Sequence, residues 1–183
     1  FQQPDQQAFL TARRKRLCKT CKKEYSSPPN ASCPDCKAKG IRLYDRLCII
    51  AGRRWGKSRI GSIAGVEEAC TPGTIGWACA PTNPKLNRYV IPAFQQLIPY
   101  DWVQSWSTEF NDLRLKNGSL IHFQTLEDPD QGRGQGLDWL WIDEVCELTE
   151  MHWNVIRPSL VDRQGVAFFT TSPQSFDWVY ETL

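Results

Sequence analysis

The feature that most constrains the fold is an apolar run of strand length, followed by a basic glycine-containing loop and a helical pattern. Residues 43–50, LYDRLCII, form the run, and residues 51–58, AGRRWGKS, nearly match the phosphate-binding pattern G-x-x-x-x-G-K-[ST]. Residues 58–70 space apolar side chains as a helix does, and Thr71-Pro72-Gly73 predicts its end. This order predicts a nucleotide site at a helix N-terminus.

Each polar residue of the loop has a predicted role. Gly56 lets the backbone approach the phosphates, Lys57 reaches the β- and γ-phosphates of ATP, and Ser58 binds the accompanying Mg²⁺. Ala51 stands where the pattern has glycine. We expect it to lie at the end of the strand with a negative φ, where a methyl group fits. The alternative is a basic turn at the start of a helix.

The loop interior consists of Gly52, Arg53, Arg54 and Trp55. We assign these four residues to nucleotide binding, because two arginines add positive charge beside a polyphosphate. One arginine could instead face solvent or an acidic partner. Trp55 is expected to contribute packing rather than chemistry.

Three further apolar runs predict buried strands at residues 74–81, 137–144 and 165–173. Buried strands that do not alternate, separated by helical stretches, indicate an α/β fold with a mainly parallel sheet and helices on both faces. Residues 84–98 predict a helix that Pro92 kinks or breaks. Residues 113–123 predict a β-hairpin with a type I′ turn at Asn117-Gly118.

The run LDWLWIDE ends in two carboxylates. Asp143 is predicted to hold Mg²⁺, directly or through water, and Glu144 to orient and deprotonate the attacking water. Acids at this place also serve as helix N-caps, which is the alternative. The run FFTTSP, residues 168–173, ends in hydroxyl groups that could sense the γ-phosphate.

Residues 131–136, QGRGQG, place Arg133 on a glycine-flanked loop. Such an arginine could reach a phosphoryl transition state as an arginine finger. A solvent-exposed loop charge is an equally good interpretation of the local sequence.

Four cysteines form two C-x₂-C pairs with eleven residues between them. This spacing predicts a zinc ribbon with a structural Zn²⁺ in a tetrahedral site that leaves no open position. Disulfides are the alternative in an oxidising compartment. The predicted ligands are Cys18, Cys21, Cys33 and Cys36.

The charge is distributed unevenly. Residues 13–42 hold ten Lys or Arg and two Asp or Glu, whereas the rest of the chain holds twelve and eighteen. The segment is either a solvated charge run or a surface that faces nucleic acid. No apolar run approaches the roughly 20 residues of a membrane span, and no signal peptide is evident.

Several motifs together resemble one family. The loop at 52–58, APTNP at 80–84, PDQGRGQGLDWLWIDE at 129–144, IRPSLVDRQG at 156–165 and FFTTSPQSFDWVYETL at 168–183 follow in the order found in the ATPase domain of phage large terminase subunits. The resemblance extends over the chain apart from residues 13–42. It implies a P-loop ATPase of the additional-strand class, and residues 1–12 and 43–183 would form its ATPase domain.

The resemblance also implies roles for residues. Lys57, Ser58, Asp143 and Glu144 match the phosphate-loop lysine and hydroxyl, the magnesium-site acid and the catalytic acid. Arg133 falls where some members carry an arginine finger that acts across a ring. Gln6 lies at a position that contacts adenine in related motors, with Gln7 as the alternative. The coupling motif, which links hydrolysis to movement, falls on Thr170, Thr171 and Ser172.

The resemblance further implies the biological setting. The expected function is ATP-driven translocation of double-stranded DNA into a procapsid by a homo-oligomeric ring, with portal and small terminase subunit as partners, in the cytoplasm of the infected bacterial host. The zinc ribbon, residues 13–42, is a predicted insertion. The nuclease domain of the family would follow Leu183, so we expect no DNA cleavage from this chain.

Two other functions are compatible with the residues alone. One is a helicase or another nucleic-acid-dependent P-loop ATPase, which would share the site but not the ordered motifs. The other is a zinc-ribbon adaptor attached to a nucleotide-binding fold. Loss of hydrolysis with retained nucleotide binding after substitution of Glu144 would favour an ATPase.

Overall fold

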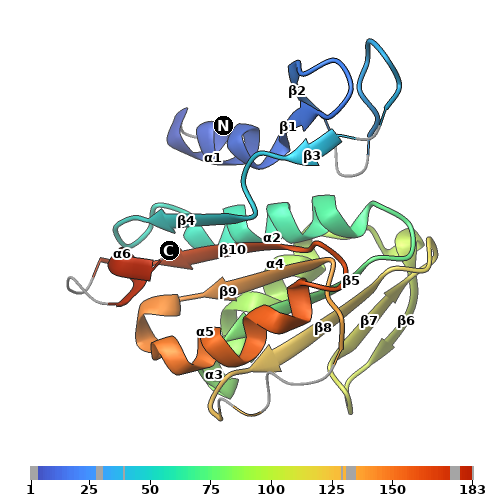
Figure 1. Ribbon diagram of the computed structural model, residues 1–183. Coiled ribbons are helices and arrows are strands. Elements are labelled where there is room, and N and C mark those ends of the chain that lie inside the picture. Colours follow the sequence, from blue (N-terminus) through green and yellow to red (C-terminus); the bar gives the residue numbers. More distant parts are fainter. Residues whose placement is uncertain are drawn as a thin grey trace.

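The chain folds into a large and a small sheet, and the computed structural model describes residues 4–27, 31–38, 40–128, 130, 135–173 and 178–182. The large sheet has seven strands in the order β4-β10-β9-β5-β8-β7-β6, and the small sheet has three, β2-β1-β3 (Figure 1). The strands are β1 (Lys15–Cys18), β2 (Glu24–Ser26), β3 (Gly40–Arg42), β4 (Arg46–Ile50), β5 (Ile75–Ala80), β6 (Val103–Ser107), β7 (Asp112–Leu115), β8 (Leu120–Thr125), β9 (Trp139–Asp143) and β10 (Val166–Thr171).

The large sheet is mainly parallel, which confirms the predicted α/β class. Strands β4, β10, β9, β5 and β8 pair in parallel, and β7 and β6 continue the sheet antiparallel. Strand β10 lies between β4 and β9, so an additional strand separates the two strands that carry the predicted site. All their carboxyl ends therefore meet at one edge of the sheet.

Helices cover both faces of the large sheet (Figure 1). Side chains alternate along β9: Trp139 and Trp141 pack in a core with α2 and α4, and Leu140 and Ile142 pack in a second core with α5 and α6. The helical segments are α1 (Pro4–Arg14), α2 (Lys57–Ala69), α3 (Asn83–Lys85), a π-helix (Leu86–Val90), α4 (Ile91–Leu97), α5 (Glu150–Ile156), α6 (Trp178–Thr182) and short 3₁₀ turns at Tyr100–Trp102, Val145–Glu147 and Arg157–Leu160.

Two local predictions require correction. The hairpin between β7 and β8 is confirmed, but in its turn only Gly118 has a positive φ, of 84°, so the turn is not type I′. Asn117 keeps an ordinary φ, and its side chain donates to the carbonyl of Ala69 at 2.8 Å. In the predicted helix at 84–98, the irregularity is a π turn directly before Pro92 rather than a break at it.

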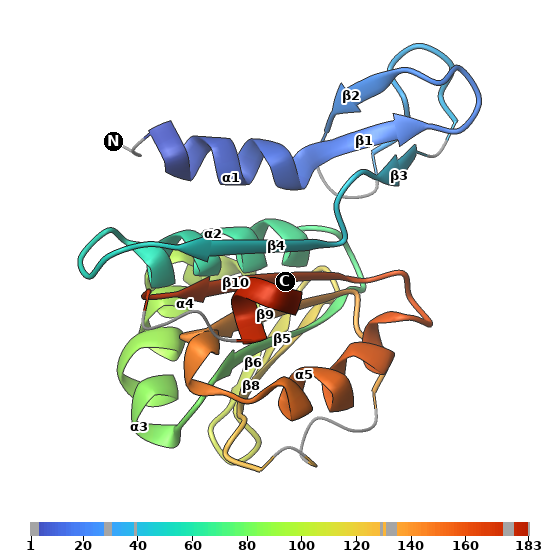
Figure 2. The same ribbon diagram turned by 60° about the vertical axis from the view of Figure 1, so that its left-hand side comes forward.

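The N-terminal helix and the small sheet lie together on one side of the large sheet, over α2 and β4 (Figures 1 and 2). Phe9 and Leu10 of α1 are buried in the same core as α2. Helix α1 continues to Arg14, so Arg13 and Arg14 are helical. We call residues 15–42 the cysteine module and residues 43–182 the body. Among the described residues, no helix is long and apolar enough to cross a membrane.

Candidate active site and metal centre

The basic loop joins β4 to α2 at the carboxyl edge of the sheet. Ala51 directly follows β4, has no positive φ, and donates its N–H to the carbonyl of Thr171 at 3.0 Å. The expectation that alanine fits here is thus confirmed. Gly56 has a φ of 92°, which disfavours a side chain, and it precedes the first turn of α2. The unpaired N–H groups of that turn are available to an anion.

Lys57 and Glu144 face each other across this edge. Lys57 is buried, its Nζ donates to the carbonyl of Gly52 at 3.3 Å, and it lies 3.7 Å from Oε1 of Glu144. Glu144 follows β9 in a left-handed conformation, with φ 49° and ψ 48°. Its carboxylate accepts from the N–H and the hydroxyl of Ser172, at 3.0 and 3.3 Å. The acid is therefore held by the end of β10.

Asp143 lies at the centre of a buried hydrogen-bond network. Its two oxygens accept from the hydroxyls of Ser58, at 2.6 Å, and Thr170, at 2.7 Å. Trp141 Nε1 in turn donates to Thr170 Oγ1 at 2.9 Å. Burial raises the pKa of Asp143, and the bonds from Ser58 and Thr170 oppose that rise. Three adjacent strands thus bring the predicted magnesium ligands, Ser58 and Asp143, into contact.

The end of β10 connects both halves of the site. Besides accepting from Ala51, Thr171 accepts through its hydroxyl from the N–H of Cys146, at 3.2 Å, in the turn after Glu144. Thr170 and Ser172 contact Asp143 and Glu144. The three residues predicted as a coupling motif therefore link the loop to both carboxylates.

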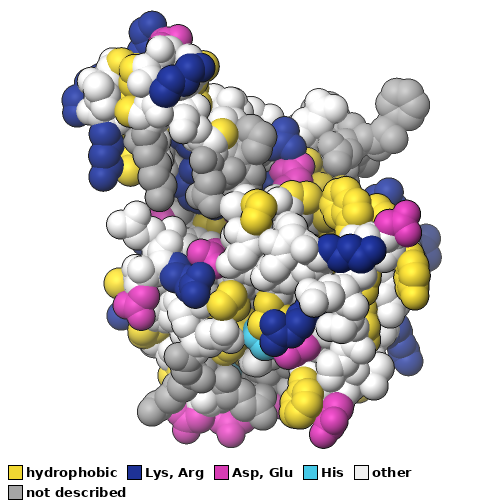
Figure 3. Space-filling model, turned by 90° about the vertical axis from the view of Figure 1, so that its right-hand side faces the viewer, with side chains coloured by type: hydrophobic (Ala, Val, Ile, Leu, Met, Phe, Trp, Pro, Cys, Tyr) yellow, Lys and Arg dark blue, Asp and Glu magenta, His cyan; other side chains and the backbone are white. Residues whose placement is uncertain are grey.

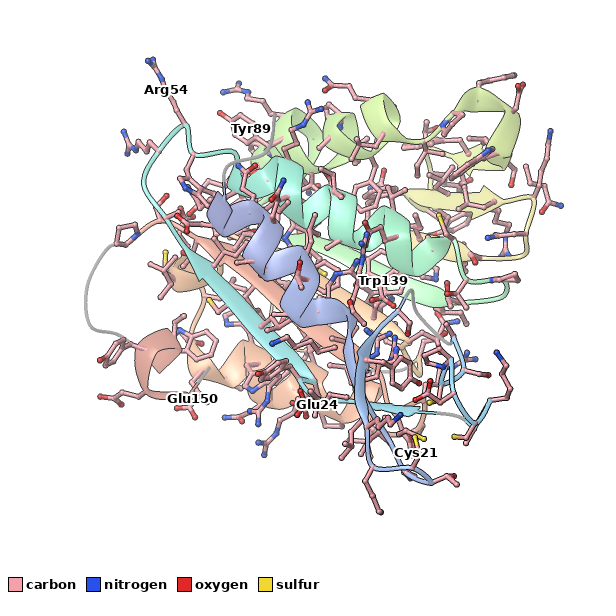
Figure 4. All side chains as sticks on the ribbon, turned by 90° about the horizontal axis from the view of Figure 1, so that it is seen from above. Cys21, Glu24, Arg54, Tyr89, Trp139 and Glu150 are labelled. Atoms are coloured by element: carbon pink, nitrogen blue, oxygen red, sulfur yellow. The ribbon has the colours of Figure 1, made fainter. Side chains whose placement is uncertain are left out.

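The remaining loop residues occupy different surroundings. Arg53 and Arg54 are exposed, and Arg54, which has a φ of 64°, points outward from the loop (Figure 4). Trp55 packs against the core, as expected. Gln6 of α1 donates to the carbonyl of Trp55 at 2.7 Å, so it lies beside the loop. Arg133 falls outside the described residues.

A cleft of about 880 Å³ opens above these groups, between the loop and the segments that follow β5, β9 and β10. Sequence reasoning missed three of its lining side chains, Lys85, Tyr89 and Glu147, and Lys85 forms an ion pair with Glu147. Their position in the sequence could have identified them, because residues that follow a parallel strand lie at the same edge of the sheet as the phosphate loop. Tyr89 lies on the same side of the molecule as Arg54 (Figure 4).

The four predicted zinc ligands converge in the cysteine module. Their Sγ atoms all lie within 4.8 Å of one another, with Cys18–Cys36 at 3.3 Å and Cys21–Cys33 at 3.7 Å. Zn–S bonds of about 2.3 Å in a tetrahedron place sulfurs roughly 3.8 Å apart, whereas a disulfide needs about 2.05 Å. The donor set and the separations fit Zn²⁺.

The two cysteine pairs share one local geometry. The N–H of Lys22 donates to the carbonyl of Cys18, and that of Lys37 to the carbonyl of Cys33, and both lysines have a φ of 59°. The N–H of Cys21 also donates to Cys18 Sγ at 3.4 Å, and this bond is the main cause that lowers the pKa of Cys18. The hydrogen bond with Cys18 in turn raises the pKa of Cys21 and of Cys36, so the four thiols share their protons.

The basic segment is only partly a free surface. Arg13 is 1% exposed and forms ion pairs with Glu67 and Glu68 of α2, and Arg16 is 4% exposed. Arg13 therefore does not belong to a free basic surface, because Glu67 and Glu68 of α2 supply its opposing charge. Arg16 is buried beside Ser27, to whose hydroxyl its Nε donates at 3.2 Å.

The chain was compared with known proteins. No protein-family model matches it. The large terminase subunits of Thermus phage G20c and Thermus virus P23-45 are each 28% identical over 151 residues, which cover 71% of this chain and 31% of theirs. The chain thus spans about a third of the length of the curated relatives it matches.

Solved structures agree with these sequence matches. The Thermus phage P74-26 large terminase ATPase domain superposes with a TM-score of 0.61 at 26% identity, over 74% of this chain and 62% of that one. The HK97 bacteriophage large terminase shares the fold, with a TM-score of 0.66 at 13% identity, over 94% of this chain and 33% of that one. With its loop, paired acids and the end of β10 in one site, the chain is a homologue of the ATPase domain of phage large terminase subunits.

Proposed function

We propose that this chain is the ATP-hydrolysing motor domain that drives double-stranded viral DNA into a procapsid. The observation that carries the proposal is the contact of Ser58, Asp143 and Thr170 beside the Lys57–Glu144 pair. The groups needed for phosphoryl transfer to water thus gather at the carboxyl ends of three adjacent strands, at the mouth of one cleft.

Nucleotide binding is assigned to the loop and its neighbours. The N–H groups after Gly56 and the ammonium of Lys57 hold the phosphates, and Gly52, Arg53 and Arg54 complete the loop. In binding phosphate, Lys57 exchanges its contacts with Gly52 and Glu144 for phosphate oxygens. Gln6 is the proposed adenine contact, supported by its bond to the carbonyl of Trp55.

Glu144 is the proposed general base. Its carboxylate takes a proton from water as the water oxygen attacks the γ-phosphorus, and the bond from that phosphorus to the leaving ADP oxygen breaks. The N–H and hydroxyl of Ser172 hold the carboxylate in place. Ser58 and Asp143 would hold Mg²⁺, which would supply neutralising charge to the phosphate oxygens. Through Thr170, Thr171 and Ser172, a change at the phosphates reaches β10.

The test is Glu144→Gln in the full chain. We expect hydrolysis to fall by about 10²–10⁴-fold, while a fluorescent ATP analogue binds as before, because only the proton acceptor is lost. Glu147→Gln is the matched control, since Glu147 lines the same cleft but pairs with Lys85. Hydrolysis by Glu144→Gln at the parent rate would remove Glu144 from this role.

A ring is proposed for the assembled motor, with Arg133 acting on the nucleotide of the neighbouring subunit. Glu144→Gln and Arg133→Ala chains are each inactive under this proposal. Mixed in an assembled ring, they should recover part of the activity, because some interfaces combine an intact Glu144 with an intact Arg133. Absence of recovery would assign Arg133 to its own subunit or to no role in hydrolysis.

Residues 13–42 are proposed to be an inserted zinc ribbon with Cys18, Cys21, Cys33 and Cys36 as ligands. Metal analysis of the purified chain should return one zinc per chain, and none after Cys33→Ser and Cys36→Ser are combined. The portal and the small terminase subunit, in the cytoplasm of the infected bacterial host, are the proposed partners.

A further inference from the structure

A second large groove lies between the cysteine module and the body, at the edge of the sheet opposite the nucleotide cleft. Its volume is about 760 Å³. Asp45 and Arg46 line it at the start of β4, and Asp138 and Gly165 line it just before β9 and β10. Parallel strands share one direction, so these residues mark the amino edge of the sheet. Figure 4 places Cys21 of the module and Arg54 of the loop at opposite ends of the molecule.

The groove carries an excess of positive charge. Six of its lining side chains are cationic and three are carboxylates. Figure 3 faces this edge, with Lys and Arg side chains gathered on the module and more of them on the body below. The cations are Arg16, Lys19, Arg42, Arg46, Arg157 and Arg163, and the carboxylates are Asp45, Glu68 and Asp138.

All three carboxylates have a cationic neighbour. Asp45, which is largely exposed, lies 3.8 Å from Nε of Arg46 in a solvent-screened pair. Glu68 accepts from Arg13 and from both terminal nitrogens of Arg42, at 2.7 and 2.8 Å, and Asp138 accepts from Arg163 at 3.0 Å. The side chains of Lys19 and Arg157 have no hydrogen bond or ion pair within the described part of the chain. Their charge is therefore available to a ligand.

Arg16 adds a buried charge that forms no ion pair with a carboxylate among the described residues. It lines the groove at 4% exposure, and its Nε donates to the hydroxyl of Ser27 at 3.2 Å. Its Nη2 is buried and unpartnered among the described residues. The negative charge that acts on it is Glu68, which also pairs with Arg13 and Arg42, so an anion in the groove would further stabilise these three cations.

We propose that this groove binds the phosphodiester backbone of duplex DNA. Arg46 and Arg157 from the body and Lys19 from the module supply the contacts, and Arg16 supplies positive charge beneath them. Five of the six cations are arginines, whose fork of donors matches phosphate oxygens. The exposed lysines 15 and 22 extend the positive surface along the module, as a polyanion requires. The charge of the groove by itself implies an anionic ligand. The identification of that ligand as DNA rests on the proposed function.

The groove also has a direct connection to the nucleotide site. Helix α2 begins with Lys57 and Ser58 and carries Glu68 near its other end, in the groove. Eleven residues of helix separate Lys57 from Glu68, which is roughly 17 Å. A phosphate bound in the groove and one bound at the loop therefore act on the two ends of one helix.

The experiment compares two double variants of the full chain that lose the same charge. Arg46→Gln with Arg157→Gln removes two exposed groove cations, and Arg114→Gln with Lys116→Gln removes two exposed cations on and after β7. Affinity for a labelled 30-base-pair duplex is measured by fluorescence anisotropy over a series of salt concentrations. We expect the groove variant to lower the slope of log affinity against log salt by about 2, and the control to leave it unchanged.

Each outcome decides the proposal. Equal slopes for the two variants would overturn the groove as a DNA site, and so would a larger loss in the control. A different result would reassign the groove to a small anion. In that case the parent, the groove variant and the control variant bind DNA equally well, and inorganic phosphate raises the melting temperature of the parent but not of the groove variant. Rates of ATP hydrolysis are measured in parallel, so that this test is separate from the test of the proposed function. A parent protein that does not hydrolyse ATP refutes the proposed function but not the DNA-binding groove.

Discussion

The body and the cysteine module are stabilised by different physical means. The body contains two cores of buried apolar side chains, and all eight tryptophans of the chain lie in it. Within the described part of the module, the buried apolar side chains are Cys18 and Cys33, both of them predicted zinc ligands. The body is therefore stabilised by the hydrophobic effect, whereas the module has too little apolar core for this, and the proposed metal would stabilise it.

The junction between the two regions is electrostatic. Glu68 of α2 is buried and pairs with Arg13 of α1 and Arg42 of β3. Arg13 also lies over the ring of Phe168 in β10, with its Cζ 6.0 Å from the ring centroid. A cluster of buried charge thus joins a metal-dependent module to the sheet that carries the active site.

Removal of zinc should separate the two regions most strongly. Structural Zn²⁺ contributes an apparent free energy on the order of 10 kcal/mol at neutral pH, so a strong chelator should unfold the module. Near-ultraviolet circular dichroism of the tryptophans should remain, because the body does not contain the ligands. Loss of the tryptophan signal together with the zinc would show that the body also depends on the metal.

Glu68→Gln tests the junction. It leaves Arg13 and Arg42 without their buried carboxylate and should lower the free energy of unfolding by about 3–5 kcal/mol, measured by urea denaturation. Glu67→Gln is the matched control, because Glu67 is 25% exposed and should contribute far less. Equal losses of unfolding free energy in the two variants would mean that the burial of Glu68 does not determine the stability of the junction.

The same carboxylate predicts a pH dependence. Burial alone would raise the pKa of Glu68, but the hydrogen bonds and charges of Arg42, with the charge of Arg13, hold it below its usual value. A folded pKa below the unfolded one gives stability that is present above the unfolded pKa and is lost as the pH falls through the folded pKa. The advantage of the parent over Glu68→Gln should therefore shrink below about pH 4. A constant difference down to pH 2 contradicts this.

Replacement of a glycine by alanine, made once in the body and once in the module, gives the smallest expected effects on the free energy of unfolding. An alanine at Gly76 would place its Cβ 1.7 Å from the fully buried ring of Trp139, and at Gly40 it would lie 2.1 Å from the hydroxyl of Tyr25. Gly76→Ala should cost about 1–3 kcal/mol, since the packed core cannot yield. Gly40→Ala should cost less than about 1 kcal/mol, because the half-buried Tyr25 can move. Thermal melts that rank the two in reverse refute this view of the module.

The class of fold followed from the sequence alone. Buried apolar runs predict parallel strands whatever their order, and the loop pattern predicts the roles of Lys57 and Ser58. The cysteine spacing likewise predicted which four sulfurs converge, because two C-x₂-C turns suit a tetrahedral ion. Each of these signals is local, so it can be found without knowledge of distant contacts.

Only the tertiary structure decided how distant residues combine. No local signal places β10 between β4 and β9, which brings Thr170 to Asp143 and Ser172 to Glu144. The same holds for Arg13, which appears in the sequence as part of a basic surface and is buried in ion pairs with α2. The charge of a segment can be counted from its sequence. Whether a charged side chain is exposed depends on the partners that folding brings to it, and Glu67 and Glu68 lie more than fifty residues from Arg13 in the sequence.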